Sequence, residues 1–460
     1  MSSRGDFVAR RRRLVVILAA LIVLELFGGA AALQRGAHPG TGSTSSSGPT
    51  NSPSPRIDPR PTTPVSGGAI ASTPAAAARA LLARRADAVL HHDRAAFLST
   101  VDPRQPALRT AQGRLFDNLD RVPLSAWSYR LDPSSGLSVT GARLARYHDK
   151  VWAAEADLGY ALRGGDTTTT DRPQYLTFVQ RGRSWYYASE DDFTADGKPS
   201  WRGIWDYGPV VVARTHDSLV LAHPAHARQA AILAQDVEHA IPEVNAVWGT
   251  DWARRVVALL PDSTQEMTRL IGGNLDLEHI AAVATADYTD TDAGVVRGQR
   301  VVVNPTTLAT LGTLAGQVVL RHEITHVATR AATGAATPTW LAEGFADYIG
   351  YRNSGVPVDL AARDLRAEVR AGTLPLTLPA YKDFNGANPR LSAVYQESWM
   401  ACRLIARDAG EAGLVRFYRL VGRGAGNPIA VVDRALRAVL GIGYDDFVVA
   451  WRADLASELS

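Results

Sequence analysis

Two kinds of hydrophobic spacing divide the chain from residue 73 onward into helical and extended segments. In the first part, apolar residues at helical spacing predict three helices, and alternating apolar residues then predict a set of strands. The predicted helices cover residues 74–90, 94–100 and 105–119, and the predicted strands cover residues 125–131, 144–162, 175–180 and 184–188. The order of the elements therefore predicts an α+β unit over residues 73–206.

The second part, residues 207–460, begins with strands and ends with long helices. The predicted strands cover residues 210–214, 219–222, 255–260, 280–285 and 299–303, with a long amphipathic helix over residues 225–248. A second α+β unit is therefore expected. In the first unit, helices that precede a curved antiparallel meander resemble the cone-shaped nuclear-transport-factor-2-like fold, and the resemblance implies that fold for residues 73–206.

The first 72 residues differ in composition from the rest. Residues 14–33 are apolar apart from Glu25, and about 20 such residues span a bilayer. Residues 1–13 are basic, which predicts a cytoplasmic tail before a transmembrane anchor; a cleaved signal peptide is the alternative. Residues 34–72, rich in Ser, Thr, Pro and Gly, are predicted to be a disordered linker. We therefore expect a single-pass protein of the cell membrane with its bulk extracytoplasmic, or a secreted protein if the segment is cleaved.

The charge distribution argues against a nucleic-acid-binding protein, and the cysteine content excludes an intramolecular disulfide. The formal net charge is +3, but five arginines and one aspartate give +4 in the first thirteen residues, which leaves about −1 for the rest. No nucleic-acid partner is expected from this distribution. The single cysteine, Cys402, cannot form an intramolecular disulfide.

One segment carries candidate metal chemistry, the run Leu320-Arg321-His322-Glu323-Ile324-Thr325-His326-Val327. On a helix, His322 and His326 project from one face, one turn apart. Two imidazoles at this spacing can share one metal ion. Glu323, next to the first histidine, is placed to reach a water on that metal rather than the metal itself.

A second segment supplies the missing ligand. Glu343 lies in the run Trp340-Leu341-Ala342-Glu343-Gly344-Phe345-Ala346-Asp347-Tyr348, a predicted helix that begins with Thr337 as cap and Pro338 at its first position. A catalytic zinc site uses three protein ligands and an open fourth position. Glu343 is the predicted third ligand, and Asp347, one turn on, is predicted to accept a hydrogen bond from a ligating histidine.

These residues resemble the gluzincin metallopeptidases, especially the peptidase MA-like group, over about residues 210–455. The resemblance implies a zincin-like domain, with a mixed sheet and a helical lobe, over residues 207–460. It implies one Zn²⁺ per chain held by His322, His326 and Glu343, with Glu323 as general base and Tyr395 as an oxyanion stabiliser. One departure is that sixteen residues separate the second histidine from the glutamate, fewer than in the best-known members.

The predicted function is hydrolysis of peptide bonds in a peptide or protein substrate. Zinc activates water, and Glu323 transfers its proton to the leaving amine. The strand at residues 299–303, with Val301, Val302 and Val303, is expected to be the edge to which an extended substrate adds, and Asn304 to contact the substrate backbone.

Three alternatives stay open on sequence grounds. The protein can be a non-catalytic, membrane-anchored binding protein with a vestigial or structural zinc site. It can also be a zinc amidase that acts on a cell-wall substrate. Finally, residues 73–206 can recognise an unknown protein partner, although no residues can be named for that role.

Overall fold

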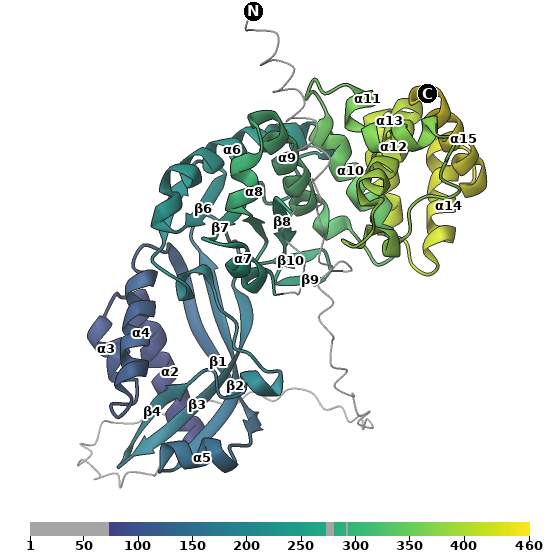
Figure 1. Ribbon diagram of the computed structural model, residues 1–460. Helices are drawn as coiled ribbons and strands as arrows, with labels where there is room; N and C mark the ends of the chain where they lie inside the picture. Colours follow the sequence, from purple (N-terminus) through teal and green to yellow (C-terminus); the bar gives the residue numbers. More distant parts are fainter. Residues whose placement is uncertain (1–72, 273–279, 291–292) are drawn as a thin grey trace, which may run out of the picture.

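The computed structural model describes residues 73–272, 280–290 and 293–460 (Figure 1). Three helices open the first unit: α2 (Pro74–Leu90), α3 (Arg94–Ser99) and α4 (Pro106–Leu119). Thr73 caps α2 by accepting a hydrogen bond from the Ala76 amide at 3.2 Å, and Pro74 occupies the first turn, where no amide donor is needed. The predicted helices are confirmed to within one residue at each end.

A four-stranded antiparallel sheet follows, in the order β1-β2-β3-β4. The strands are β1 (Leu124–Leu137), β2 (Val151–Leu162), β3 (Thr170–Arg181) and β4 (Ser184–Ser189). Gly182 has a φ of +60°, which permits the tight turn between the last two strands. The helices pack on this sheet, which is long and curved (Figure 1). The nuclear-transport-factor-2-like fold itself stays a prediction.

The predicted strand over residues 144–162 is wrong in its first part. Residues Gly141–Tyr147 form a short helix, α5, which ends where His148 adopts a left-handed conformation with a φ of +52°. The Tyr147 ring is buried, and its hydroxyl donates to Asp192 at 2.6 Å. This tertiary contact fixes a helix in a stretch whose apolar spacing also fits a strand.

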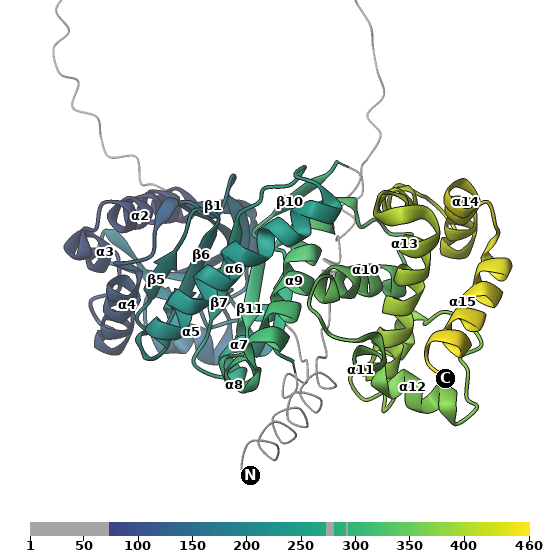
Figure 2. The same cartoon turned by 90° about the horizontal axis from the view of Figure 1, so that it is seen from above.

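The second unit is built on a mixed five-stranded sheet with strand order β5-β6-β7-β11-β8. Its strands are β5 (Val211–Arg214), β6 (Ser218–Ala222), β7 (Val256–Leu260), β8 (Ala282–Thr285) and β11 (Arg300–Val303). Helices α6 (Ala227–Trp248) and α9 (Thr313–Thr329) cover one face, while α7 (Thr264–Ile271) and the first unit lie at the other (Figures 1 and 2). Burial on both faces explains the nearly continuous apolar runs of β6, β7 and β11.

The expectation that residues 299–303 form the sheet edge is wrong. Strand β11 pairs with β7 on one side, parallel, and with β8 on the other, antiparallel. Val301, Val302 and Val303 therefore have no free edge for a substrate strand. The side chain of Asn304 caps the short helix α8 (Pro305–Thr310), where its Oδ1 accepts hydrogen bonds from two amides at 3.1 and 3.3 Å.

The edges of this sheet are β5 and, beside β11, β8. Residues Ala282 and Ala284 of β8 are only 1% and 2% exposed, and the Ala284 carbonyl accepts a hydrogen bond from Arg330 at 2.9 Å. After β8 in the chain, β9 (Tyr288–Asp290) and β10 (Val295–Arg297) form a separate two-stranded antiparallel sheet. Arg330 therefore occupies at least one backbone acceptor of the β8 edge, the Ala284 carbonyl.

A helical lobe completes the second unit (Figure 2). It contains α10 (Thr339–Tyr351), α11 (Val358–Ala361), α12 (Arg363–Arg370), α13 (Leu391–Gly422), α14 (Pro428–Leu440) and α15 (Tyr444–Glu458). Gly410 breaks the helical conformation of α13 with a φ of +75°. The expected α+β architecture, a sheet followed by a helical lobe, is confirmed.

Apolar contacts join the two units. One hydrophobic cluster contains Phe97 and Trp127 of the first unit together with Leu221, Val257 and Val302 of the five-stranded sheet. The predicted boundary at residue 206 therefore separates two sheets, but it does not separate two independent cores.

The predicted location at the cell membrane must be corrected. Within the described ranges, the chain contains no helix that is both long enough and apolar enough to cross a bilayer. The longest one, α13, carries charged side chains along its length. The predicted tail, anchor or signal segment and linker, residues 1–72, lie outside the described residues.

Candidate metal centre

Helix α9 places the two histidines as their spacing predicts. Its apolar residues Val319, Leu320 and Ile324 are at most 1% exposed and pack against the five-stranded sheet and α6. His322, Glu323 and His326 are 2%, 0% and 1% exposed. Burial of three ionisable side chains on one helix is costly unless they have partners or a metal ion. This cost indicates that the three side chains have a role besides packing, such as holding a metal ion.

Helix α10 brings Glu343 to the histidines because glycines let it approach its neighbours closely. A Cβ atom added at Gly344 would lie 2.2 Å from the Ser398 carbonyl oxygen of α13. One added at Gly350 would lie 3.0 Å from the Val318 carbonyl oxygen of α9. Helix α10 is therefore held between the metal-site helix α9 and helix α13, and Glu343, 1% exposed, points between the two histidines.

The three predicted ligand atoms form a compact triangle. The Nε2 atoms of His322 and His326 are 2.9 Å apart. The Oε2 atom of Glu343 lies 3.3 Å from the first and 3.5 Å from the second. Ligands held at about 2.0–2.1 Å from one tetrahedral zinc ion are about 3.4 Å apart. The separations fit that requirement, and the donor set of two imidazoles and one carboxylate suits zinc.

Asp347 orients the first histidine from behind. Its Oδ1 atom lies 2.8 Å from Nδ1 of His322, which leaves Nε2 facing Glu343. Burial lowers the pKa of His322, but the charge and hydrogen bond of Asp347, with a smaller contribution from Glu343, raise it well above its usual value. An imidazole whose Nδ1–H is held in this way presents Nε2 as the ligand atom.

The other predicted site residues are less closely connected to this cluster. Glu323 lies on the same helix, adjacent to His322, and is fully buried. Tyr395 lies near the start of α13, with its ring edge-on to Phe384 and the ring centres 5.3 Å apart, and its predicted role stays a prediction. Residues 301–303 belong to strand β11 of the sheet, and Asn304 is the N-cap of α8.

Two features of the site were not predicted from the sequence. Gly344 lets α10 pack closely against α13, and Gly350 lets it pack closely against α9. The two glycines, six residues apart in a predicted helix, were the sequence feature from which this close packing could have been predicted. Arg330 ends the metal-site helix and donates a hydrogen bond to the Ala284 carbonyl of edge strand β8. No sequence motif predicts this contact.

A second group that can hold a metal consists of His216, Asp217 and Glu238, which are exposed or half-buried. Glu238 instead closes a turn, because its Oε2 atom accepts hydrogen bonds from the Thr215 hydroxyl at 2.5 Å and the Asp217 amide at 2.9 Å. The fold and the buried site together define an α+β protein with a two-histidine, one-carboxylate ligand set.

Comparison with known proteins finds similarity only among solved structures. No protein-family model and no curated protein matches the chain. An M1 zinc metallopeptidase from Deinococcus radiodurans is similar at 16% identity and a TM-score of 0.33, over 65% of this chain and 60% of that one. A mutant of an M1 zinc metallopeptidase from Deinococcus radiodurans, with a bound Tyr-Ser-Ala substrate, is similar at 14% identity and a TM-score of 0.32, over 65% and 60% of the two chains. The chain thus spans about three fifths of the structures it matches.

Proposed function

We propose that this protein is a zinc-dependent hydrolase of peptide bonds, with His322, His326 and Glu343 as the metal ligands. The observation that carries the proposal is the triangle of ligand atoms, with separations of 2.9, 3.3 and 3.5 Å. Glu323 follows His322 on the same helix. Three protein ligands leave a fourth position for water or substrate, whereas structural zinc sites are closed by four.

Bound zinc would supply Lewis acidity, which polarises the scissile carbonyl and makes water a better nucleophile. Glu323 accepts the proton of the attacking water and delivers it to the leaving amine, which is the role of a general base followed by a general acid. Asp347 keeps His322 in one tautomer and orientation. Tyr395 is proposed to donate a hydrogen bond to the developing oxyanion.

Burial of the site favours one rival, a metal-binding protein without turnover. His322, Glu323, His326 and Glu343 are each at most 2% exposed, and a peptide must reach them before it can react. At the β8 edge, Arg330 likewise occupies the Ala284 carbonyl, with which a substrate strand could otherwise pair. Under the proposal, part of the wall around the site moves when substrate binds. If the protein only binds metal, the wall around the site stays closed.

Turnover by a matched pair of proteins tests the proposal. Wild type and Glu323→Gln, both loaded with zinc, are incubated with a quenched fluorescent unfolded protein and with purified cell-wall material. We expect cleavage of the unfolded protein by wild type, and a loss of at least about a hundredfold in the variant with zinc content unchanged. Activity retained in Glu323→Gln would refute the mechanism, cleavage of wall material alone would favour the amidase, and no cleavage by the zinc-loaded wild type would favour the rival.

A further inference from the structure

A short segment of the chain, residues 207–209, connects the two units. It follows the 3₁₀ helix η2 (Ile204–Asp206) and precedes β5, where the five-stranded sheet begins. His223, directly after β6, is 3% exposed and lies against this segment. A Cβ atom added at Gly208 would lie 3.1 Å from Nδ1 of His223, so a glycine here permits the close approach. The imidazole is therefore part of the junction between the units.

Both ring nitrogens of His223 face oxygen atoms that accept hydrogen bonds. Nδ1 lies 2.9 Å from the carbonyl oxygen of Pro209, which can only accept. Nε2 lies 2.8 Å from Oε1 of Glu266 in α7. A neutral imidazole carries a single N–H group and can donate only one of these two hydrogen bonds. Both are formed when the ring is an imidazolium and Glu266 is a carboxylate.

Charged and titratable groups around His223 favour its protonated form. Glu266 is 6% exposed, and its second oxygen accepts a hydrogen bond from the Asp262 amide at 2.9 Å, so the carboxylate has a donor on each oxygen. The Asp262 side chain, 3.4 Å from His226, adds a second negative charge, and Tyr207 of the junction segment lies within electrostatic range of Glu266. Burial lowers the pKa of His223, but the hydrogen bond and charge of Glu266, together with a backbone carbonyl and the charge of Asp262, raise it above its ordinary value.

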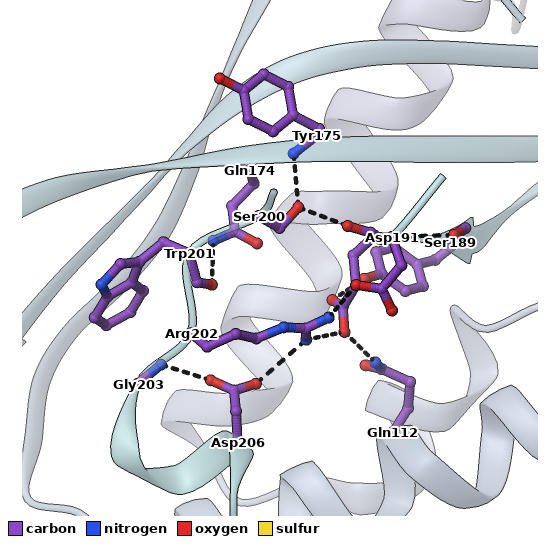
Figure 3. A network of polar contacts seen from close by, with 12 residues as sticks. Gln112, Gln174, Tyr175, Ser189, Asp191, Ser200, Trp201, Arg202, Gly203 and Asp206 are labelled. Atoms are coloured by element: carbon purple, nitrogen blue, oxygen red, sulfur yellow. Dashed lines mark hydrogen bonds and ion pairs between the residues drawn. The ribbon is translucent and has the colours of Figure 1, made fainter. Parts of the chain in front are cut away.

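Asp206 fixes the other end of the segment, where it leaves the first unit (Figure 3). Its Oδ2 atom accepts a hydrogen bond from the Gly203 amide at 2.8 Å, and its Oδ1 atom lies 3.5 Å from Arg202. Arg202 also pairs with Glu190 and Asp191, so three carboxylates share one guanidinium. Burial and the charge of Glu190 raise the pKa of Asp206 to about 7. Folding therefore favours the protonated acid, and the contribution of Asp206 to stability also falls as the pH rises toward 7.

We propose that His223 is a pH-sensitive switch at the junction of the two units. As an imidazolium it ties the junction segment to α7 through Pro209 and Glu266. A neutral ring must direct the lone pair of one nitrogen at an oxygen atom, so one of the two contacts is lost. Because the pKa of His223 is raised in the folded protein, the stabilisation is complete below pH 6.5 and is lost as the pH rises through the folded value. The junction is thus tight in mildly acidic solution and loosens in more alkaline solution.

Protonation of His223 is measured on the full chain by nitrogen-15 NMR of the histidine rings, from about pH 5 to about pH 9. His223→Gln identifies the signals of this ring by their absence. We expect more than half of the molecules to carry a hydrogen on both ring nitrogens of His223 at pH 6.5, the ordinary pKa of histidine. A ring with a single hydrogen at that pH would overturn the proposal, because Glu266 would then carry the shared proton.

The free energy of unfolding, measured by denaturant titration over the same pH range, tests whether this proton stabilises the fold. The difference between wild type and His223→Gln should be largest below pH 6.5 and should shrink as the pH rises. Asp206 is present in both proteins, so its own titration cancels from the difference. His216→Gln, which changes a histidine whose side chain is 84% exposed, should leave the pH dependence unchanged. A difference between wild type and His223→Gln that is constant or grows with pH would overturn the proposal.

Amide hydrogen exchange shows whether the junction itself responds. In wild type, peptides covering residues 204–212 and 262–268 should exchange about fivefold faster on the alkaline side of the titration, after correction for the intrinsic rate, which is the factor expected for one lost hydrogen bond. Residues 74–90 of α2 should not change. Glu266→Gln, which keeps an acceptor oxygen but removes the charge, should show the faster exchange already at pH 6.5, and it serves as the second variant if His223→Gln does not fold. Equal exchange of the junction peptides on both sides of the titration would overturn the proposal.

Discussion

The contact between Asp347 and His322 is the most informative single residue pair of the metal centre. Asp347 accepts the Nδ1–H at 2.8 Å and thereby aims Nε2 at the ligand triangle. Loss of such a partner typically costs 10–100-fold in metal affinity. We therefore predict that Asp347→Ala binds zinc about 10–100-fold more weakly, as measured by competition with a chromophoric chelator. Asp347→Asn, which keeps an acceptor oxygen, should fall between wild type and Asp347→Ala.

An exposed aspartate provides the control for this measurement. Asp445→Ala in the first turn of α15 should bind zinc as wild type does. If Asp347→Ala also binds zinc with wild-type affinity, the hydrogen bond to His322 plays no part in holding the metal.

Close packing of α10 is the decisive feature at the scale of elements. A Cβ atom at position 344 would overlap the Ser398 carbonyl oxygen, so Gly344→Ala must push α10 away from α13. Overpacking of this kind costs about 1–3 kcal/mol. Because Glu343 is the neighbouring residue, we predict a lower free energy of unfolding together with weaker zinc binding, measured by denaturant titration and chelator competition. Gly386→Ala, where nothing lies within 4 Å, should change neither quantity.

The elements show which parts of the fold follow from local pattern. The ligand helices were predictable because His322 and His326 repeat at helical spacing, and Glu343 lies in an apolar helical run. The short helix at 141–147 was not, because its conformation depends on the distant contact between Tyr147 and Asp192. The position of β11 inside the sheet was not predictable either, because the order of strands is set by packing between segments far apart in sequence.

The predicted ligand set came together in space, whereas the predicted substrate strand did not. The positions of the ligands depend only on one helix and its neighbour. Whether a strand lies at the edge depends on the order of all strands in the sheet.

At the scale of the whole molecule, a buried ion pair joins the two units. Arg300 of β11 donates two hydrogen bonds to Asp166, at 2.7 and 2.8 Å, and both side chains are about 5% exposed. Removal of one partner leaves an uncompensated buried charge, which costs about 3–5 kcal/mol. We predict that Arg300→Ala loses about that much stability by denaturant titration, while both units still unfold in one calorimetric transition because they share a core.

Two comparisons make this prediction specific. Arg130→Ala, which breaks two solvent-accessible ion pairs, to Asp157 and Asp171, should change stability by less than about 1 kcal/mol. The double change Arg300→Met with Asp166→Leu should recover part of the loss, since no charge is then stranded. Two separate transitions in wild type would show that the units fold independently and that the shared core contributes little.

Zinc content of the purified protein tests the central claim most directly. Wild type and Glu343→Ala are equilibrated with excess zinc, freed of unbound metal, and analysed for zinc per chain by atomic absorption. The three-ligand site predicts one zinc per chain in wild type and a large loss in Glu343→Ala, which keeps only the two histidines. Absence of zinc from wild type, or equal zinc in both proteins, would contradict the proposed metal centre.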